Sequence, residues 1–458
     1  MKKLINAPDR VVDEALDGLT RANAGIARLA GSTTAIRADV DAVRAAGQVT
    51  LVSGGGAGHE PAHAGYVGAG MLTAAVAGEV FTSPPVDAVR DAIRAVASPA
   101  GVLLIIKNYT GDRLNFGLAG ELARADGVPV ETVVVADDVA LAAEAGAGRR
   151  GLAGTVLVHK VAGAAAAAGL PLAEVARRAQ RVADTVGTMG VALSPCTVPA
   201  AGQPGFLLDG DEVEWGLGIH GEPGVERAGL RPVHEVVDRL IGTITADRGI
   251  TAGQRVAVLV NGLGATPPME LSIVAGAAAR DLRGRGARVE RIWAGNFLTA
   301  LDMAGCSVSV LPVDDDLLAD LDAPTSAPAW PATATAAEPA SIAAPAGEPA
   351  EAGTLPADDP LRRALEAVAE TLISVRDELT ALDREVGDGD LGISLARGAA
   401  SVLAECPEYP GEAGPAAVLR ATSATVRRSM GGTSGPLYAV MLLRAAAALA
   451  VSEALTPR

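Results

Sequence analysis

The feature that most limits how this chain can fold is a break in composition over residues 323–358. This stretch is built mainly from Ala, Pro, Thr and Glu, as in APTSAPAWPATATAAEPASIAAPAGEPAEAG. It has neither the helical spacing nor the alternation of apolar residues that regular structure requires, so we predict an extended linker. The linker divides the 458 residues into a first block, residues 1–322, and a second block, residues 359–458.

In the first block, short β-rich runs alternate with helical patterns. Buried strands are predicted at residues 49–53, 102–106, 130–135, 256–260 and 289–293. Apolar residues at helical spacing lie between them, for example over residues 86–97 and 114–125. This alternation predicts an α/β fold. A block of this length can hold two subdomains, and we expect them to divide near residues 224–236.

The second block has the pattern of helices alone. Asp359 and Pro360 form a good helix start, because Asp can cap the first turn and Pro is tolerated there. Apolar residues then recur at helical spacing as far as Leu382, and this predicts one long first helix. Further helices are predicted around residues 416–428 and 437–455. We therefore expect an all-α domain.

Composition excludes several classes of partner. The net charge is −16, aromatic residues make up only 2%, and no basic stretch interrupts the acidic background, so nucleic acid is not expected. The apolar runs are too short to span a membrane, and the first residues, MKKLINAPDR, lack an apolar signal core. The three cysteines form no disulfide framework and no metal-binding spacing. We expect a cytoplasmic protein.

A glycine-rich run, GGGAGHEPAH, follows the predicted strand at residues 49–53. We interpret it as a loop whose backbone can approach a ligand closely. It fits neither the P-loop nor the GxGxxG pattern. His59 and His63 formally satisfy the zinc-protease pattern HExxH, but Pro61 and the preceding glycines are incompatible with the helix that this pattern needs. His59, at the edge of the loop, is predicted to be a site residue.

Two more clusters carry reactive side chains. Lys107 and Asp112 follow the strand at residues 102–106, where open α/β sheets collect ligands, and could orient and deprotonate a hydroxyl group. Glycines surround His220 in GLGIHGEPG, which predicts an accessible loop. A neutral imidazole there could add reversibly to a ketone carbon. His159 and His234 lie in regular patterns and are assigned no function.

The second block contains three closely spaced aspartates, Asp383, Asp388 and Asp390, with glycines between them. Carboxylate oxygens suit a hard cation such as Mg²⁺, which commonly bridges nucleotide phosphates. The segment SMGGTSG follows later and precedes the last predicted helix. Glycines and hydroxyl groups at a helix start can bind phosphate, and Thr433 and Ser434 would be additional donors. Together the two segments predict a site for a metal and a nucleotide.

These segments resemble the dihydroxyacetone kinase family. Residues 1–322 are similar to its ketone-binding subunit through SGGGAGHEPAHAGYVG, IIKNYTGD and GLGIHGEPG. Residues from about 361 onward are similar to its helical-barrel-like nucleotide-binding domain through LDREVGDGDLG and SMGGTSGPL. The resemblance implies an enzyme that phosphorylates dihydroxyacetone or another short ketose. Fusion of both parts in one chain is similar to the members that use ATP, whereas members fed by the sugar phosphotransferase system usually keep separate chains.

The resemblance also implies individual residue functions. His220 would hold the substrate carbonyl as a hemiaminal, with His59 and Asp112 as the acid/base pair. Gly56, Ser83, Lys107 and Asp112 would contact the substrate. The three aspartates would bind two Mg²⁺ ions that carry the phosphates of ATP. The nucleotide itself would be lined by Leu391, Gly392, Ile393, Ser394, Thr433 and Ser434. A homodimer through the first domain is implied as well.

Two departures from the family and three alternatives go with this interpretation. The chain ends at Arg458, before the family's helical domain would end, so we expect an incomplete domain. Leu391 stands where relatives often carry a polar residue. The alternatives are a four-carbon ketose such as erythrulose as substrate, a ketone-binding coactivator that transfers no phosphate, and a phosphoryl donor from the phosphotransferase system in place of ATP.

Overall fold

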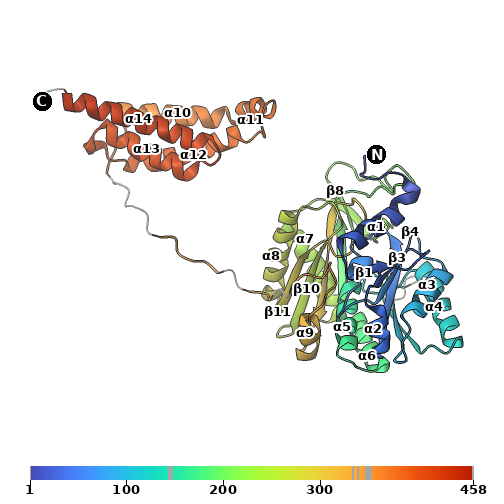
Figure 1. Cartoon of the computed structure of the whole chain (residues 1–458). Coiled ribbons are helices and arrows are strands. Elements are labelled where there is room, and N and C mark those ends of the chain that lie inside the picture. Colours follow the sequence, from blue (N-terminus) through green and yellow to red (C-terminus); the bar gives the residue numbers. More distant parts are fainter. Residues whose placement is uncertain (1, 143–147, 333–334, 338–339, 346–352, 456–458) are drawn as a thin grey trace. The chain divides into compact units, whose positions relative to one another are not determined.

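Two six-stranded sheets form the first part of the chain, and helices form the rest (Figure 1). The computed structural model describes residues 2–142, 148–332, 335–337, 340–345 and 353–455, with side chains as far as residue 450. The chain separates into two compact units, Met1–Pro339 and Ala340–Arg458. The predicted succession of an α/β part and an all-α part is confirmed.

The first sheet has the order β1-β2-β4-β3-β5-β6. Its strands are β1 (Ile26–Arg28), β2 (Thr34–Arg37), β3 (Thr50–Ala57), β4 (Ala74–Val80), β5 (Val102–Lys107) and β6 (Val130–Val135). Strands β4, β3, β5 and β6 run parallel, and β1 and β2 join them antiparallel. Because β4, β3 and β5 are parallel neighbours, the loops that follow them leave the sheet at the same edge.

Helices cover both faces of this sheet. On one face, α3 (Val86–Val96) and α4 (Thr110–Ala125) pack on alternate strand residues such as Val52 and Leu104. The residues between these, such as Leu51 and Leu103, pack in a core that includes α5 (Thr155–Ala167) and α6 (Leu172–Thr185). Twelve of the thirteen residues of α5 are buried, because the same core includes Leu259 and Leu311 from the second sheet.

The second sheet has the order β11-β10-β12-β7-β8-β9. Its strands are β7 (Gly187–Ala192), β8 (Glu212–Trp215), β9 (Glu226–Gly229), β10 (Arg255–Gly262), β11 (Arg288–Gly295) and β12 (Gly305–Pro312). Only β10 and β11 pair in parallel. Helices α7 (Val233–Arg248) and α8 (Pro268–Gly284) share a core with it. The remaining helices of the unit are α1 (Val11–Ala22), α2 (Val40–Ala45) and α9 (Asp315–Asp322).

The predicted subdomain boundary near residues 224–236 is wrong. Strands β7, β8 and β9 already belong to the second sheet, so this sheet begins just after α6. β7 has the sequence GTMGVA, whose two glycines conceal a strand that is buried along its whole length. Its place is determined by pairing with β12, more than a hundred residues later in the chain, and no local pattern reports this contact.

The linker is also shorter than predicted. Ala327 and Trp330 are buried in the core of the first unit, and the Trp330 ring lies 5.1 Å from that of Trp293. Ser326 N–H donates to the carbonyl of Ala69 at 3.0 Å. At the other end, Leu355 is buried in the core of the second unit. The composition is that of a linker, but its few large apolar side chains pack on both units, and the division between them falls after Pro339.

Over its described residues, the second unit has five α-helices. They are α10 (Pro360–Ser374), α11 (Arg376–Arg384), α12 (Leu391–Glu405), α13 (Pro415–Ser429) and α14 (Ser434–Leu455). The Asp359 carboxylate accepts from the N–H groups of Leu361 and Arg362, which confirms the predicted cap. The prediction of one long first helix is wrong, because the chain leaves helical geometry at Val375 and continues as α11. Among the described helices, none combines the length and apolar character that a membrane-spanning helix requires.

We predict opposite effects of alanine at two helical glycines. A Cβ on Gly163 in α5 would lie 2.3 Å from the Cα of Met71, so Gly163→Ala should destabilise the first unit by roughly 1–3 kcal/mol. Gly117 in α4 has nothing within 4 Å of such an atom. Gly117→Ala should therefore stabilise by about 0.5–1 kcal/mol, since alanine favours helix.

Urea unfolding followed by tryptophan fluorescence tests both variants. All three tryptophans, Trp215, Trp293 and Trp330, belong to the first unit, so the signal reports that unit alone. Equal effects of the two substitutions would contradict the close contact between α5 and the segment at Met71.

Candidate active site

His220 lies on the glycine-rich loop of residues 216–224 that follows β8. Its ring Nδ1 lies 2.7 Å from one carboxylate oxygen of Glu222, and its backbone N–H donates to the other oxygen at 2.9 Å. A carboxylate oxygen accepts a hydrogen bond, so Nδ1 carries the proton and Nε2 of the neutral ring keeps a free lone pair. Burial acts to raise the pKa of Glu222, but the bonds from His220 outweigh it and the pKa is lowered.

Three rings from the first sheet surround His220. The ring centroids of Tyr109, His59 and Phe81 lie 4.7, 4.9 and 5.1 Å from that of His220. His59 follows β3, Phe81 follows β4, and Tyr109 lies between β5 and α4. The parallel order of these three strands therefore brings the rings to one edge of the sheet, where the loop from the second sheet meets them. We call His59, Phe81, Tyr109 and His220 the ring cluster.

His59 is completely buried within the ring cluster. Its Nδ1–H donates to the carbonyl oxygen of Thr299 at 2.7 Å, and Nε2 has no hydrogen-bond partner among the described residues. Burial lowers the pKa of His59 well below its usual value, and a positive charge on His220, when that ring is protonated, or on Lys107 lowers it further. The ring is therefore neutral near pH 7, with Nε2 available as a proton acceptor.

The first four residues of the glycine-rich run, residues 54–57, belong to strand β3, and the predicted loop begins only at Gly58. A Cβ on Gly55 would lie 2.5 Å from Lys107 Nζ, and one on Gly56 would lie 2.5 Å from the backbone nitrogen of Thr82. Only glycine leaves space here for the neighbouring strand ends to approach the backbone. The groups that approach these glycines are thus Lys107 and the turn at Thr82, and the close approach of a ligand stays a prediction.

Lys107, at the end of β5, is buried beside the glycines. Its ammonium group donates to the Gly54 carbonyl at 3.2 Å and lies 3.5 Å from the carboxylate of Asp112. Asp112 is in the first turn of α4, where the helix dipole favours a negative charge. The hydroxyl oxygen of Ser83 is buried and has no partner among the described residues, and its Cβ lies 3.2 Å from where a Cβ on Gly111 would be. The predicted substrate residues thus form one group.

His63 also belongs to this group, although the sequence analysis considered it only as part of the HExxH pattern. Lys107 Nζ donates to His63 Nε2 at 2.9 Å, so His63 Nδ1–H donates to Nε2 of His159 at 3.0 Å. His159, to which we assigned no function, therefore orients His63. The HExxH alternative is excluded, because His59 and His63 bond different partners and one of these is an ammonium group.

A cavity lies beside the glycine end of β3. It has a volume of about 380 Å³ and runs between this end of the strand and α1, and Gly55, Gly56 and His63 line part of it. His220, His59, Lys107 and Asp112 do not line it. Reactive groups, rather than the size of a cavity, therefore locate the candidate active site at the ring cluster.

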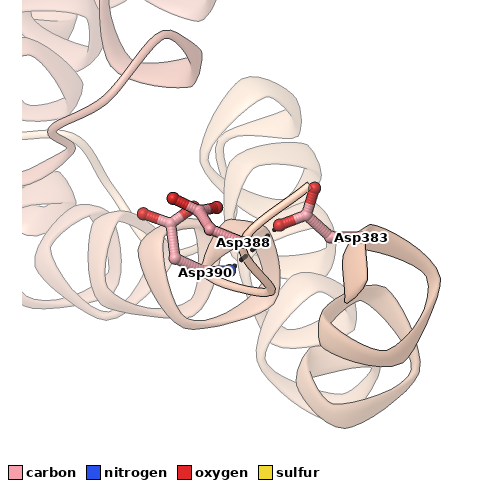
Figure 2. A group of neighbouring side chains, drawn as sticks. All are labelled: Asp383, Asp388 and Asp390. Carbon is pink, nitrogen blue, oxygen red and sulfur yellow. Dashed lines mark hydrogen bonds between the residues drawn. The ribbon is translucent and has the colours of Figure 1, made fainter. Parts of the chain in front are cut away.

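In the second unit the three aspartates do lie together (Figure 2). Asp383 is the penultimate residue of α11, and Asp388 and Asp390 lie in the turn before α12. One carboxylate oxygen from each lies within 4.8 Å of the other two. The Asp383 carboxylate also accepts from the backbone N–H groups of Asp390 and Leu391, at 2.9 and 3.2 Å, which holds the turn closed. Three converging carboxylates fit a hard cation such as Mg²⁺.

The predicted nucleotide residues lie at two helix starts of this unit. Leu391, Gly392, Ile393 and Ser394 form the first turn of α12, immediately after Asp390. Gly392 is required there, because a Cβ would lie 2.0 Å from the carbonyl oxygen of Arg376. Thr433 directly precedes α14, and Ser434 is its first residue. A helix start presents backbone N–H groups that can bind phosphate, although the N–H of Leu391 already donates to Asp383 and Pro436 in the first turn of α14 has none.

Comparisons with known proteins cover both units. The Dak1 domain matches residues 17–329, and the DAK2 domain matches residues 385–458. A putative 3,4-dihydroxy-2-butanone kinase of Solanum lycopersicum is 49% identical over 98% of this chain and 78% of its own length. The triokinase/FMN cyclase of Homo sapiens is 46% identical over 99% and 81%. The crystal structure of the dihydroxyacetone kinase from C. freundii in complex with AMP-PNP and Mg²⁺ is 35% identical, with a TM-score of 0.73 over 100% of this chain and 84% of that one.

The buried histidines predict a dependence of stability on pH. Burial, followed by the charge of Lys107, lowers the pKa of His159 from 6.5 to about 3. Between pH 3 and 6.5 the unfolded chain binds a proton that the folded chain does not, so the free energy of unfolding falls as the pH is lowered through this range. His159→Gln removes this contribution and should reduce the slope by up to about 1.4 kcal/mol per pH unit.

Urea unfolding by tryptophan fluorescence at several pH values between 4 and 6.5 measures the slope. His234→Gln is the matched control, because that side chain is 74% exposed and should leave the slope unchanged. Equal slopes for His159→Gln and the parent chain would mean that His159 is protonated alike in both states.

Proposed function

The chain belongs to the dihydroxyacetone kinase family, and we propose that it transfers the γ-phosphoryl group of ATP to a hydroxyl group of dihydroxyacetone or a similar short ketose. The observation that carries this proposal is the hydrogen bond from His220 Nδ1 to Glu222, which leaves Nε2 as a nucleophile inside the ring cluster. Kinases of simple alcohols need no such group, whereas a ketone offers a carbon that it can attack.

In the proposed binding step, Nε2 of His220 attacks the carbonyl carbon of the ketone. The π electrons of the C=O bond move to the oxygen, which takes up a proton from the solvent, and the product is a hemiaminal. Positive charge develops on the imidazole ring, and the Glu222 carboxylate, 2.7 Å from Nδ1, offsets it. Glycerol has no carbonyl carbon and cannot be held in this way, so the covalent bond selects ketones.

The proton of the reacting hydroxyl group needs an acceptor. His59 Nε2 is unpartnered and neutral near pH 7, and the Asp112 carboxylate is held beside Lys107. We assign these two groups to the acid/base step, with Lys107, Ser83 and the backbone at Gly56 as substrate contacts. His63 is a positioning residue, because it touches Lys107 and not the ring cluster's reactive nitrogen atoms.

The second unit is assigned to the nucleotide. Asp383, Asp388 and Asp390 would hold Mg²⁺, which supplies positive charge beside the transferring phosphoryl group. The first turn of α12, with Thr433 and Ser434, would contact the nucleotide through N–H and hydroxyl donors. The C. freundii relative, which matches over both units, was crystallised with AMP-PNP and Mg²⁺, and this supports ATP as the donor.

A four-carbon ketose is the second candidate substrate, because the S. lycopersicum relative is named as a putative 3,4-dihydroxy-2-butanone kinase. The coactivator alternative is disfavoured by the three converging aspartates, which a protein that binds only ketones does not need. Phosphorylation assays with ATP on dihydroxyacetone, erythrulose, glyceraldehyde and glycerol separate these possibilities. A cytoplasmic location and a homodimer through the first unit remain predictions.

We predict that His220→Ala abolishes saturable binding of dihydroxyacetone, because the nucleophile is removed. Isothermal calorimetry with the ketone alone measures this directly. His234→Ala is the control, since that histidine is exposed and lies at the start of α7, outside the loop of residues 216–224, and it should bind as the parent chain does. Unchanged binding by His220→Ala would exclude the covalent attachment.

A second prediction concerns the aspartates. Asp388→Ala should abolish Mg-ATP binding, measured by calorimetry, and leave the affinity for dihydroxyacetone unchanged, because the two sites use residues of different units. Asp377→Ala is the control, since this aspartate of α11 is 87% exposed and pairs only with the neighbouring Arg376. Loss of ketone binding in Asp388→Ala would contradict two separable sites.

A further inference from the structure

Arg150 is a buried arginine that neither the sequence patterns nor the proposed chemistry uses. It lies in the connection between β6 and α5, beside the first sheet, and is 9% exposed. Its Nε donates to the carboxylate of Asp138 at 2.6 Å, and Asp138 is fully buried. Because burying two charges costs desolvation energy, a buried ion pair of this kind need not stabilise the fold. Its function is therefore sought in the other hydrogen bonds of Arg150.

The guanidinium group reaches both ends of the loop that carries His220. Nη2 donates to the carbonyl oxygen of Gly216 at 2.6 Å, and Nη1 donates to that of Pro223 at 3.4 Å. Residues 216 and 223 flank His220 and Glu222. Because the guanidinium group is planar and its donors are fixed relative to one another, it sets the separation of the two loop ends.

The same group places positive charge beside Glu222. A Cβ on Gly218 would lie 2.0 Å from a carboxylate oxygen of Glu222 and 2.9 Å from Arg150 Nη1, so the two side chains approach each other across this glycine. Asp138 is held in turn, because its second oxygen accepts from the N–H of Ala140 at 3.0 Å. The pair therefore connects the segment between β6 and α5 to the loop of residues 216–224, which we call the histidine loop.

We infer that Arg150, with Asp138 as its counter-ion, is a positioning residue. It holds the histidine loop so that His220 Nε2 faces the other three rings of the ring cluster. It acts through His220 and Glu222 and does not touch the substrate. The inference rests on the proposed function, and it adds that ketone affinity depends on an ion pair contributed by the connection between β6 and α5. Loss of the pair lets the loop move and misdirects the nucleophile.

The test compares variants at two adjacent arginines. Arg150→Met removes the guanidinium but leaves Asp138 buried without a partner, so the double variant Asp138→Asn/Arg150→Met is measured beside it. Arg150→Lys keeps the charge and loses the planar fork. Arg149→Met is the matched control, because the Arg149 side chain pairs with Asp247 and donates to the Leu141 carbonyl, and neither of these partners belongs to the histidine loop.

We expect the dissociation constant and the KM for dihydroxyacetone to rise about 10- to 100-fold in Arg150→Met and in the double variant, a range typical of a misplaced reacting group. In Arg150→Lys, which keeps the positive charge, the dissociation constant and the KM should rise by a smaller factor. kcat at saturating ketone and the KM for Mg-ATP should stay near the parent values, since the hemiaminal, once formed, reacts as before. Arg149→Met should match the parent chain, and tryptophan fluorescence should show all variants folded.

Three results would overturn the inference. These are ketone affinity within about twofold of the parent in the folded double variant, an equal loss in Arg149→Met, and a fall in kcat with no change in KM. If the parent chain itself binds no ketone, the proposed function fails. This outcome is distinct from a failure of the Arg150 inference, because it is measured on the parent chain alone. A double variant that fails to fold while Arg150→Lys binds normally would also count against a positioning function, since it would make the pair structural.

Discussion

The hydrogen bond between His220 Nδ1 and Glu222 determines which ring nitrogen can react, and much of the first unit serves to support it. Without an acceptor at Nδ1 the imidazole could adopt either tautomer, and Nε2 would be nucleophilic only part of the time. Glu222 is two residues from His220 and accepts from both its ring and its backbone, so the loop orients its own histidine. The chemistry of the site then depends on the side chains that surround the His220 ring.

The side chains that surround the His220 ring come from the first sheet. Strands β4, β3 and β5 are parallel neighbours, and each delivers one side chain of the ring cluster from the loop that follows it. The glycines of β3 serve the same purpose by a different route, because only residues without a Cβ allow Lys107 and the turn at Thr82 to approach the strand. Loops from two sheets with separate topologies thus come together around the His220 ring.

Much of this was predictable from the sequence because it is local. The strands at residues 102–106 and 130–135, the cap at Asp359, and the grouping of Asp383, Asp388 and Asp390 all depend on residues close in sequence. The failures concern contacts between distant residues. Nothing near His59 reports that Thr299 fixes its tautomer, nothing near His63 reports His159, and β7 is recognisable only through β12. Glu222 could have been identified, since a carboxylate two residues from a loop histidine is a local signal.

The central claim is that the ketone binds covalently to His220. The most direct measurement is the ¹³C NMR spectrum of dihydroxyacetone labelled at its carbonyl carbon, recorded with a stoichiometric amount of the full chain in the absence of nucleotide. Covalent attachment moves the bound signal out of the carbonyl region to that of a tetrahedral carbon, and His220→Ala restores the free spectrum. A saturably bound ketone whose labelled carbon remains a carbonyl would contradict the account.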